Sequence, residues 1–258
     1  MNNLRIITLN IRRDRGDDGI NNWEYRKDLV APILKEQNPD IVVFQEVLAH
    51  QLEDLKQMLP EYQYVGVGRD DGIKAGEFAP LFYKGMSVEE EGTFWLSDTP
   101  DTPSCTWPGM TRICTWAFFS GEYTFVLFNT HFEYEFEFTQ LKSIDLLIER
   151  TGSYSEDFPL LLTGDFNFNP HTVPYKYLNE FFRDSYTEDQ DSLLTTNHLW
   201  NGRTEVLSGK SNRIDYIWNR GNLQVKECRI LLDNPATKPG IYPSDHWPVL
   251  CDIQLPRL

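Results

Sequence analysis

Apolar residues recur along the chain in short runs that are separated by turns rich in Gly, Pro, Asn and Asp. Such runs predict strands, and a few longer segments have the spacing of amphipathic helices. Strands are expected over residues 4–10, 40–47, 62–67, 80–83, 92–97, 112–119, 123–131, 160–164, 213–218, 225–232 and 249–255, and helices over 23–37, 48–59, 138–150 and 175–182. Residues 184–207 show a mixed pattern that favours neither. No repeat or linker interrupts this alternation, so we expect one α/β domain over residues 1–258.

One strand, which follows Pro159, ends in the stretch Gly164-Asp165-Phe166-Asn167. Gly164 allows the backbone to leave the strand in a tight turn. Asp165 and Asn167 are two positions apart, so on extended backbone they point to the same side. A carboxylate and an amide placed in this way can position a nucleophile. The alternative is ordinary turn chemistry, because both residue types close turns on their own backbone.

Several other predicted strands also carry polar residues at or near their ends. These residues are Asn10, Glu46, His131, Asp215, Asp245 and His246. A carboxylate buried behind an apolar strand is costly unless it is paired or binds a cation. Each residue has a structural alternative when taken alone; Glu46, for example, could be an acid in the first turn of the next helix. Taken together, they predict a polar site on the rim of two packed sheets.

Composition limits the classes of partner. The apolar share of 40% is enough for a large core, and the net charge of −15 disfavours tight binding of duplex nucleic acid, which needs a basic face. A small anionic substrate held by a metal and a few arginines remains allowed. The four cysteines, Cys105, Cys114, Cys228 and Cys251, show no CxxC spacing, so free thiols and no zinc site are expected. No leader or membrane span is visible, although an exported chain stripped of its leader would look the same.

Six short motifs occur in an order that resembles the endonuclease/exonuclease/phosphatase superfamily, which includes DNase I and inositol polyphosphate 5-phosphatases. They are Thr8-Leu9-Asn10, Phe44-Gln45-Glu46, Asn129-Thr130-His131, Thr163-Gly164-Asp165-Phe166-Asn167, Arg213-Ile214-Asp215-Tyr216 and Pro243-Ser244-Asp245-His246. The resemblance covers nearly the whole chain. It implies a four-layer α/β sandwich, in which two mixed sheets lie face to face between helices, and hydrolysis of phosphoesters with Mg²⁺ or Mn²⁺.

The resemblance also implies roles for the metal and the attacking water. Glu46 is the expected principal metal ligand, and a carboxylate suits a hard ion of this kind. Asn10 should lie beside it and touch the metal, a metal-bound water or the phosphate, and Asp245 should lie near the metal. Asp165 is expected to orient or deprotonate the attacking water, and Asn167 is expected to donate to a phosphate oxygen.

Further residues are expected to bind the phosphoryl group. His246 should act as a cation or as an acid/base, with Asp215 fixing its tautomer. His131 matches a second phosphate-contacting histidine of the nuclease branch, and Glu77 is placed to pair with it. Arg112 is a candidate phosphate clamp, because a guanidinium binds phosphate through two parallel hydrogen bonds.

The substrate is less well defined than the reaction. Gly66–Gly72 and Gly76-Glu77 look like stretches of a largely uncharacterised bacterial subgroup. Trp107 could frame a sugar, a base or a lipid head group, or it could belong to the core. We expect a monomeric phosphoesterase for a small or single-stranded phosphoester, with DNA or RNA cleavage as an alternative within this class. A catalytically silent module that binds a phosphorylated ligand is the alternative outside it, but such a module has no physical reason to retain buried acids.

Overall fold

Two six-stranded sheets form the centre of the computed structural model, which describes residues 3–186, 194–202, 213–232 and 240–256. The first sheet has the order β11-β12-β1-β2-β4-β3, with β1 (Leu4–Asn10), β2 (Ile41–Gln45), β3 (Gln63–Val65), β4 (Leu81–Tyr83), β11 (Gln224–Ile230) and β12 (Val249–Gln254). The second has the order β5-β6-β7-β8-β10-β9, with β5 (Ser87–Trp95), β6 (Ile113–Ser120), β7 (Phe125–His131), β8 (Leu160–Asp165), β9 (Arg183–Asp184) and β10 (Asp215–Arg220). Both sheets are mixed, because β1 pairs in parallel with β2, and β7 in parallel with β8, beside antiparallel neighbours.

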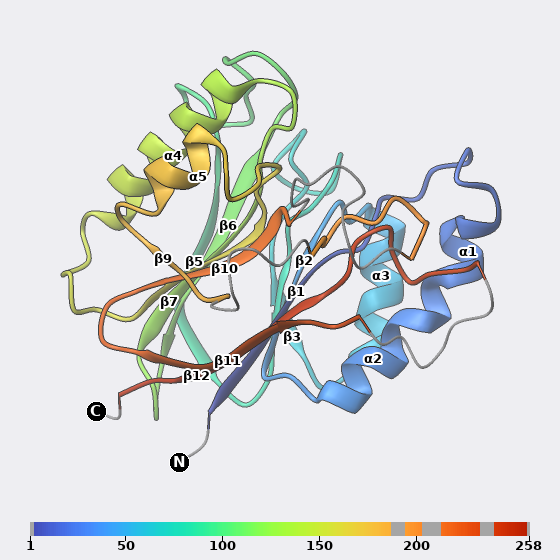
Figure 1. Ribbon diagram of the computed structural model, residues 1–258, viewed down its shortest axis with the longest axis horizontal. Helices are drawn as coiled ribbons and strands as arrows, with labels where there is room; N and C mark the ends of the chain where they lie inside the picture. Colours follow the sequence, from blue (N-terminus) through green and yellow to red (C-terminus); the bar gives the residue numbers. More distant parts are fainter. Residues whose placement is uncertain (1–2, 187–193, 203–212, 233–239, 257–258) are drawn as a thin grey trace.

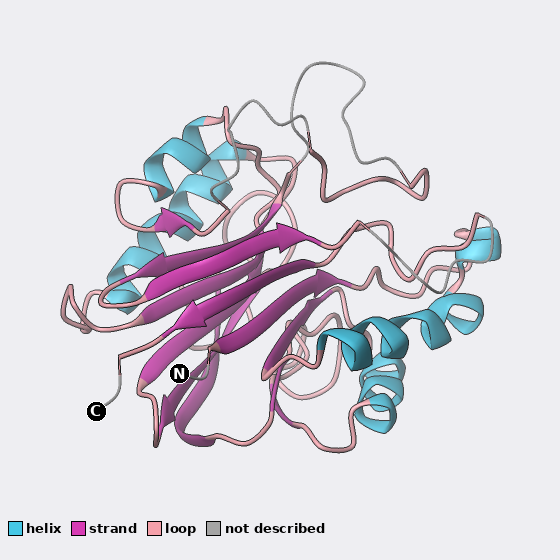
Figure 2. Cartoon of the chain, turned by 60° about the horizontal axis from the view of Figure 1, so that its bottom comes forward, coloured by secondary structure: helices cyan, strands magenta, loops and turns pink. Residues whose placement is uncertain are grey.

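Helices cover the outer faces of both sheets, as Figures 1 and 2 show. The first sheet packs against α1 (Trp23–Arg26), α2 (Val30–Gln37) and α3 (Ala49–Met58), and the second against α4 (Glu137–Thr151) and α5 (Val173–Leu178). Ile33 of α2 and Leu55 of α3 share one apolar cluster with Ile7 of β1, whereas Leu147 of α4 packs with Leu162 of β8. The four-layer sandwich that the sequence predicts is therefore confirmed.

The alternation of side chains along each strand decides what lies between the sheets. On β1, Ile6 packs into the cluster between the sheets, whereas Ile7 and Leu9 pack toward the helices. On β8, Leu161 faces inward and Leu162 faces α4. Because the period of a strand is two, the residues that continue the inward series are polar: Thr8 and Asn10 on β1, Gln45 on β2, Asn129 and His131 on β7, Thr163 and Asp165 on β8. The polar end of this interface carries the site.

A buried polar layer joins the two sheets directly beneath that site. Gln45 Nε2 donates to Thr8 Oγ1 at 3.1 Å and to Asn129 Oδ1 of the second sheet at 2.8 Å. Asn129 Nδ2 donates back to the carbonyls of Phe44 and Pro80. Buried amide N–H groups that are paired in this way specify one relative position of the sheets, because any other would leave them without acceptors.

Several predicted element boundaries are wrong; β5, for example, begins at Ser87 and not at residue 92, and α5 ends at Leu178 and not at residue 182. The helix expected over 23–37 is α1, a 3₁₀ turn (Lys27–Leu29) and α2, because Pro32 in the first turn of α2 lacks the N–H that a continuous helix would need. The strand expected over 213–218 begins only at Asp215, which therefore opens β10 instead of interrupting it. Of residues 184–207, which the sequence left unassigned, 187–193 and 203–207 lie outside the described residues.

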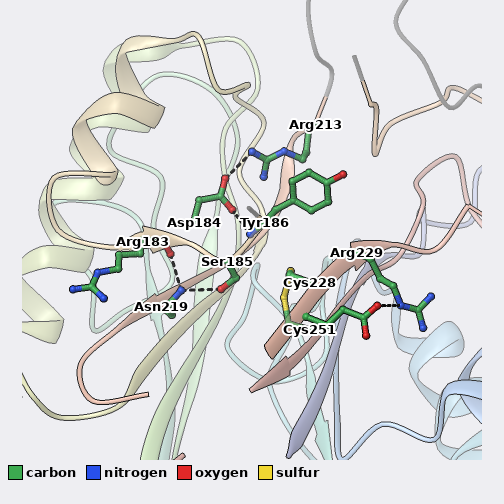
Figure 3. Close-up of a disulfide and its surroundings, with 10 residues drawn as sticks. Arg183, Asp184, Ser185, Tyr186, Arg213, Asn219, Cys228, Arg229 and Cys251 are labelled. Carbon is green, nitrogen blue, oxygen red and sulfur yellow. Dashed lines mark hydrogen bonds and ion pairs between the residues drawn. A yellow bond between two sulfur atoms is a disulfide. The ribbon is translucent and has the colours of Figure 1, made fainter. Parts of the chain in front are cut away.

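The expectation of free thiols is wrong for two of the four cysteines. Cys228 on β11 and Cys251 on β12 are opposite each other in antiparallel register and form a disulfide, with 4.1 Å between their Cα atoms (Figure 3). The pairing had no sequence signal, because strand register and not spacing along the chain brings the two residues together. Cys105 and Cys114 are free. In the described part of the chain, no helix is both long and apolar enough to cross a membrane.

Candidate active site

A pocket of about 310 Å³ lies at the polar end of the sandwich. Most of the residues predicted for the site line it, namely Glu46, Glu77, Arg112, His131, Asp165, Asn167, Asp245 and His246. Asn10 and Asp215 lie directly behind this lining and hydrogen-bond to it. Trp107 does not line the pocket. It is buried in the cluster between the second sheet and α4, so the core alternative describes its position.

His246 lies between two buried carboxylates. Its Nδ1 is 2.8 Å from Asp215 Oδ2, and its Nε2 is 4.0 Å from Asp165 Oδ2. Burial lowers the pKa of His246, but the carboxylates of Asp215 and Asp165 outweigh it and raise the pKa to about 10. Burial, together with the charge of Asp215, raises the pKa of Asp165 to about 7. The imidazole is therefore a cation at neutral pH, and Asp165 lies close to the point where it exchanges a proton.

Asn10 connects Asp165 to Glu46 across the two sheets. Its Nδ2 donates to Asp165 Oδ2 at 2.9 Å and to Glu46 Oε1 at 3.1 Å. Its Oδ1 accepts from the Arg12 N–H at 2.9 Å, which fixes the orientation of the amide. In this arrangement Asn10 presents its amino group, and not its oxygen, to both carboxylates.

Four residues that line the pocket have left-handed backbone that is unusual outside glycine. They are Arg12 at φ 59°, Glu46 at φ 62°, Asn167 at φ 52° and Leu199 at φ 50°. Asparagine tolerates this region, but for Arg, Glu and Leu it costs free energy that the surrounding contacts must offset. Gly164 has φ 136°, and a Cβ atom there would lie 1.9 Å from the carbonyl oxygen of Thr130. The close approach of β8 to β7 just before Asp165 therefore requires glycine.

His131 pairs with Arg112, whereas the sequence had predicted Glu77 as its partner. Arg112 Nη1 is 2.9 Å from His131 Nδ1, and because a guanidinium can only donate, Nδ1 accepts and the ring proton is on Nε2. Burial and the charge of Arg112 hold the pKa of His131 well below its ordinary value. Glu77 instead forms ion pairs with Arg13 at 3.0 Å and Arg69 at 2.6 Å. The pairing was mispredicted because Arg13 reaches Glu77 from the loop after β1, and the loop that carries Glu77 folds back so that its own Arg69 also reaches it.

The donors beside the pocket fit a hard divalent cation such as Mg²⁺ or Mn²⁺, which prefers oxygen ligands. Burial raises the pKa of Glu46, but hydrogen bonds from the Arg13 N–H and Asn10 outweigh it, so the pKa is lowered and the side chain is a carboxylate. Asp245, with Oδ2 3.5 Å from Arg12 Nη1, adds a second carboxylate to the lining. This donor set fits the ion.

A tighter cluster, formed by Asp165, Asp215 and His246, offers ligand atoms that all lie within 4.8 Å of one another. In this cluster His246 Nδ1 is already engaged by Asp215. An imidazole that is hydrogen-bonded to one carboxylate and lies 4.0 Å from a second suits proton handling better than coordination of an ion that prefers oxygen. We therefore interpret this cluster as the acid/base part of the site.

Sequence reasoning missed two contributions to the pocket. The first is the loop after β1, from which Arg12, Arg13 and Arg15 line the pocket. With Arg112 they balance the four carboxylates of the lining, whereas the whole chain has a net charge of −15. The sequence could have indicated this contribution, because four arginines close to a predicted acidic site are unusual in a chain with few cations.

The second is Asn197, whose side-chain amide lies 3.1 Å from His246 Nε2 and, with its oxygen turned to the ring, can accept from the charged imidazole. The segment that carries it pairs with the Asp245–Trp247 loop through His198 N–H to Asp245 O and Trp247 N–H to Thr196 O. No sequence signal pointed to Asn197, since this contact depends on a pairing 49 residues apart.

The fold and the site define a phosphoesterase-like protein of the DNase I architecture. The model of the Endonuclease/Exonuclease/phosphatase family matches residues 7–246, and the chain belongs to this family, whose members are generally phosphoester hydrolases.

Solved structures place it near bacterial members of the family. A Bacteroides vulgatus endonuclease/exonuclease/phosphatase is 36% identical with a TM-score of 0.88, over 99% of this chain and 100% of that one. A Bacteroides thetaiotaomicron mannosyl-6-phosphatase is 31% identical with a TM-score of 0.87, over 97% of this chain and 99% of that one. The structure of D. rerio TDP2 complexed with single-strand DNA product, 18% identical with a TM-score of 0.76 over 98% and 99% of the two chains, shares the fold.

Proposed function

We propose that this chain is a Mg²⁺- or Mn²⁺-dependent hydrolase of small phosphoesters, in which water attacks phosphorus. The observation that carries the proposal is the arrangement of His246 between Asp215 and Asp165, with Asp165 joined to Glu46 through Asn10. It combines an acid/base group with a carboxylate able to hold a cation in one pocket. Hydrolysis of an anionic ester needs both functions.

Glu46 and Asp245 would hold the ion, and Asn10 keeps the Glu46 carboxylate in place through its hydrogen bond. When bound, the ion supplies positive charge that polarises a phosphate oxygen. The remaining functions belong to the side chains of the pocket.

Asp165 orients the attacking water and accepts its proton. Its Oδ1 accepts from the Asn167 N–H at 3.0 Å and its Oδ2 accepts from Asn10, so the carboxylate is held at both oxygens. A pKa of about 7 suits a general base at neutral pH. Asn167 Nδ2 donates to the carbonyl of Phe132 at 2.9 Å, which uses one of its two amide hydrogens and leaves the second for a phosphate oxygen.

The two histidines, His131 and His246, have different roles in this mechanism. His246, charged through Asp215, neutralises the phosphoryl group and donates a proton to the leaving oxygen from Nε2. His131 is neutral and carries its proton on Nε2, which faces Asp165 Oδ2 at 3.6 Å and can donate to a phosphate oxygen without adding charge. Arg112, 5% exposed, orients His131 and adds positive charge beside the phosphate position.

The size and charge of the pocket favour a small ester. A volume of about 310 Å³ holds a phosphate with a group of roughly sugar size. Because the relative from Bacteroides thetaiotaomicron is described as a mannosyl-6-phosphatase, phosphorylated sugars are the first substrates to examine.

The proposal is tested with a panel of phosphoesters: p-nitrophenyl phosphate, bis-p-nitrophenyl phosphate, mannose 6-phosphate, other sugar phosphates, nucleotides and a single-stranded oligonucleotide. We expect turnover of at least one small ester that EDTA abolishes and Mg²⁺ or Mn²⁺ restores. A folded protein that cleaves none of them with either metal, yet binds one of them, would instead be a phospholigand-binding module. Preferred cleavage of the oligonucleotide would make it a nuclease.

A further inference from the structure

Arg26, the last residue of α1, is a fully buried cation outside the pocket lining. Its guanidinium donates from Nε to Asn21 O at 2.8 Å, from Nη1 to Ile11 O at 2.6 Å and Pro243 O at 2.8 Å, and from Nη2 to Arg12 O at 2.6 Å. Within the described part of the chain, these partners are all main-chain carbonyls and none is a carboxylate. Four of the five N–H donors of the arginine are used. Burying a charged group costs free energy, so this arrangement indicates that the position of the guanidinium is important to the structure.

The carbonyls that Arg26 binds belong to the segments that carry the site. Ile11 directly follows Asn10, and Arg12 places its own side chain in the pocket, 3.5 Å from Asp245. Pro243 precedes Ser244, whose hydroxyl group donates to Asn10 O and accepts from the His246 N–H. A single nitrogen, Nη1, therefore ties the end of β1 to the loop that delivers Asp245 and His246.

Arg26 also helps to hold Arg12 in its unusual backbone conformation. The carbonyl of Arg12, a residue with φ 59°, accepts from Arg26 Nη2 and from Gln51 Nε2 at 3.0 Å. Left-handed backbone at a non-glycine residue persists only where neighbours over-determine it. These two donors supply that restraint, so the direction in which the Arg12 side chain enters the pocket depends on Arg26.

The segment that contains Trp200 also contacts the Arg26 guanidinium, through the indole ring of that residue. The Arg26 guanidinium carbon lies 4.9 Å from the ring centroid of Trp23 and 5.3 Å from that of Trp200. Trp200 directly follows Leu199, which lines the pocket. Cation–π contacts to a desolvated arginine are among the stronger ones, so this segment is held by the same side chain.

We propose that Arg26 is a positioning residue for the hydrolytic site: it sets the position of Arg12 relative to Asp245 and His246 by joining the loops that carry them. This inference rests on the proposed function for its kinetic consequence, but not for its structural one. Lysine cannot replace Arg26, because one ammonium group at the end of a flexible stem cannot reach carbonyls in four directions from one plane.

The test compares Arg26→Lys with Arg220→Lys as a matched control. Arg220 is partly buried, whereas Arg26 is fully buried, but it likewise donates to a main-chain carbonyl, that of Thr151, at 2.9 Å and has an aromatic ring, Phe182, at 5.2 Å. It lies at the end of β10 remote from Asp215. Thermal unfolding establishes the temperature at which each variant is folded. kcat, KM and the imidazole ¹H–¹⁵N signals of His246 are then measured below it.

In Arg26→Lys we expect kcat to fall ~10- to 100-fold, because small misplacements of catalytic groups have effects of this size, while KM changes less. The His246 signals should also shift. Arg220→Lys should change neither kcat nor the His246 signals. A kcat and His246 signals like those of the wild type in folded Arg26→Lys would overturn the inference, as would equal effects in Arg220→Lys.

If Arg26→Lys does not fold, Trp200→Leu replaces it, since this change removes the ring and keeps the four hydrogen bonds. We then expect a smaller fall in kcat and a shift of the His246 signals, and unchanged values for both would overturn the inference. Absence of turnover in the wild type would contradict the proposed function alone, because the His246 signals report on Arg26 without any substrate.

Discussion

Asp215 and His246 form a buried pair in which Oδ2 of the carboxylate lies 2.8 Å from Nδ1 of the imidazole. The pair joins the start of β10 to the loop before β12, and 31 residues separate its members in the sequence. Neither side chain has appreciable contact with solvent. The pair therefore fixes both the direction and the charge of His246, and its effect on that charge can be measured.

The pKa values of the two buried histidines of the pocket should be shifted in opposite directions. In metal-free protein, the pKa of His246 is raised to about 10, so its ring should stay protonated as the pH rises through neutrality. The pKa of His131 is lowered by burial and by Arg112, so its ring should stay neutral down to acidic pH. Asp215→Asn removes the principal charge that raises the pKa of His246 and leaves the burial that lowers it, so this pKa should fall. Imidazole ¹⁵N shifts recorded against pH measure all three effects, and a His246 pKa that is unchanged in Asp215→Asn would contradict the assignment.

His246→Asn should lower turnover and leave the fold intact. The asparagine amide can still donate to Asp215, but it can neither carry a positive charge nor transfer a proton. We expect kcat to fall by ~10²–10⁴-fold, the usual contribution of an acid/base group. His171→Ala, at an exposed position outside the pocket, is the control and should retain full turnover. A near-native rate in His246→Asn would remove this residue from the chemistry.

Replacement of Gly164 by alanine should destabilise the chain much more than the same change at Gly121. Both glycines have strongly positive φ, 136° and 125°, but a Cβ atom at Gly121 meets nothing within 4 Å. The backbone strain alone is worth ~1–2 kcal/mol, whereas the added clash with Thr130 should bring the loss for Gly164→Ala to about 4 kcal/mol or more. Urea unfolding curves give both values. Equal losses would mean that β7 and β8 can separate freely beside Asp165.

The inward direction of the site residues that lie on strands follows from side-chain alternation, which is a local rule. Once Ile6 is assigned to the core between the sheets, Asn10 must point the same way, and Leu161 fixes Asp165 by the same reasoning. The order of the six motifs then supplied the family. The fold and the membership of the chain in this family are accordingly the parts that the structure and the comparisons confirm.

The choice of side-chain partners could not be predicted in this way. Glu77 was expected beside His131 but binds Arg13 and Arg69, and nothing in the local pattern distinguishes these partners. The disulfide between Cys228 and Cys251 depends on strand register, which sequence spacing does not encode. Choices of this kind are made by packing across the whole domain.

The central claim, that this pocket hydrolyses phosphoesters with a divalent cation held by Glu46, is tested most directly by a comparison of Glu46→Gln with Glu53→Gln. Glu53 is an exposed residue of α3 that pairs only with Lys56 in the described structure, so it controls for the loss of one negative charge. Turnover of the best substrate from the panel is measured as Mg²⁺ is added to metal-free protein. Loss of a residue that merely supports a metal ligand costs roughly 10–100-fold, so loss of the ligand itself should cost more, whereas Glu53→Gln should follow the wild type. A Mg²⁺ response of Glu46→Gln that matches the wild type would contradict the account.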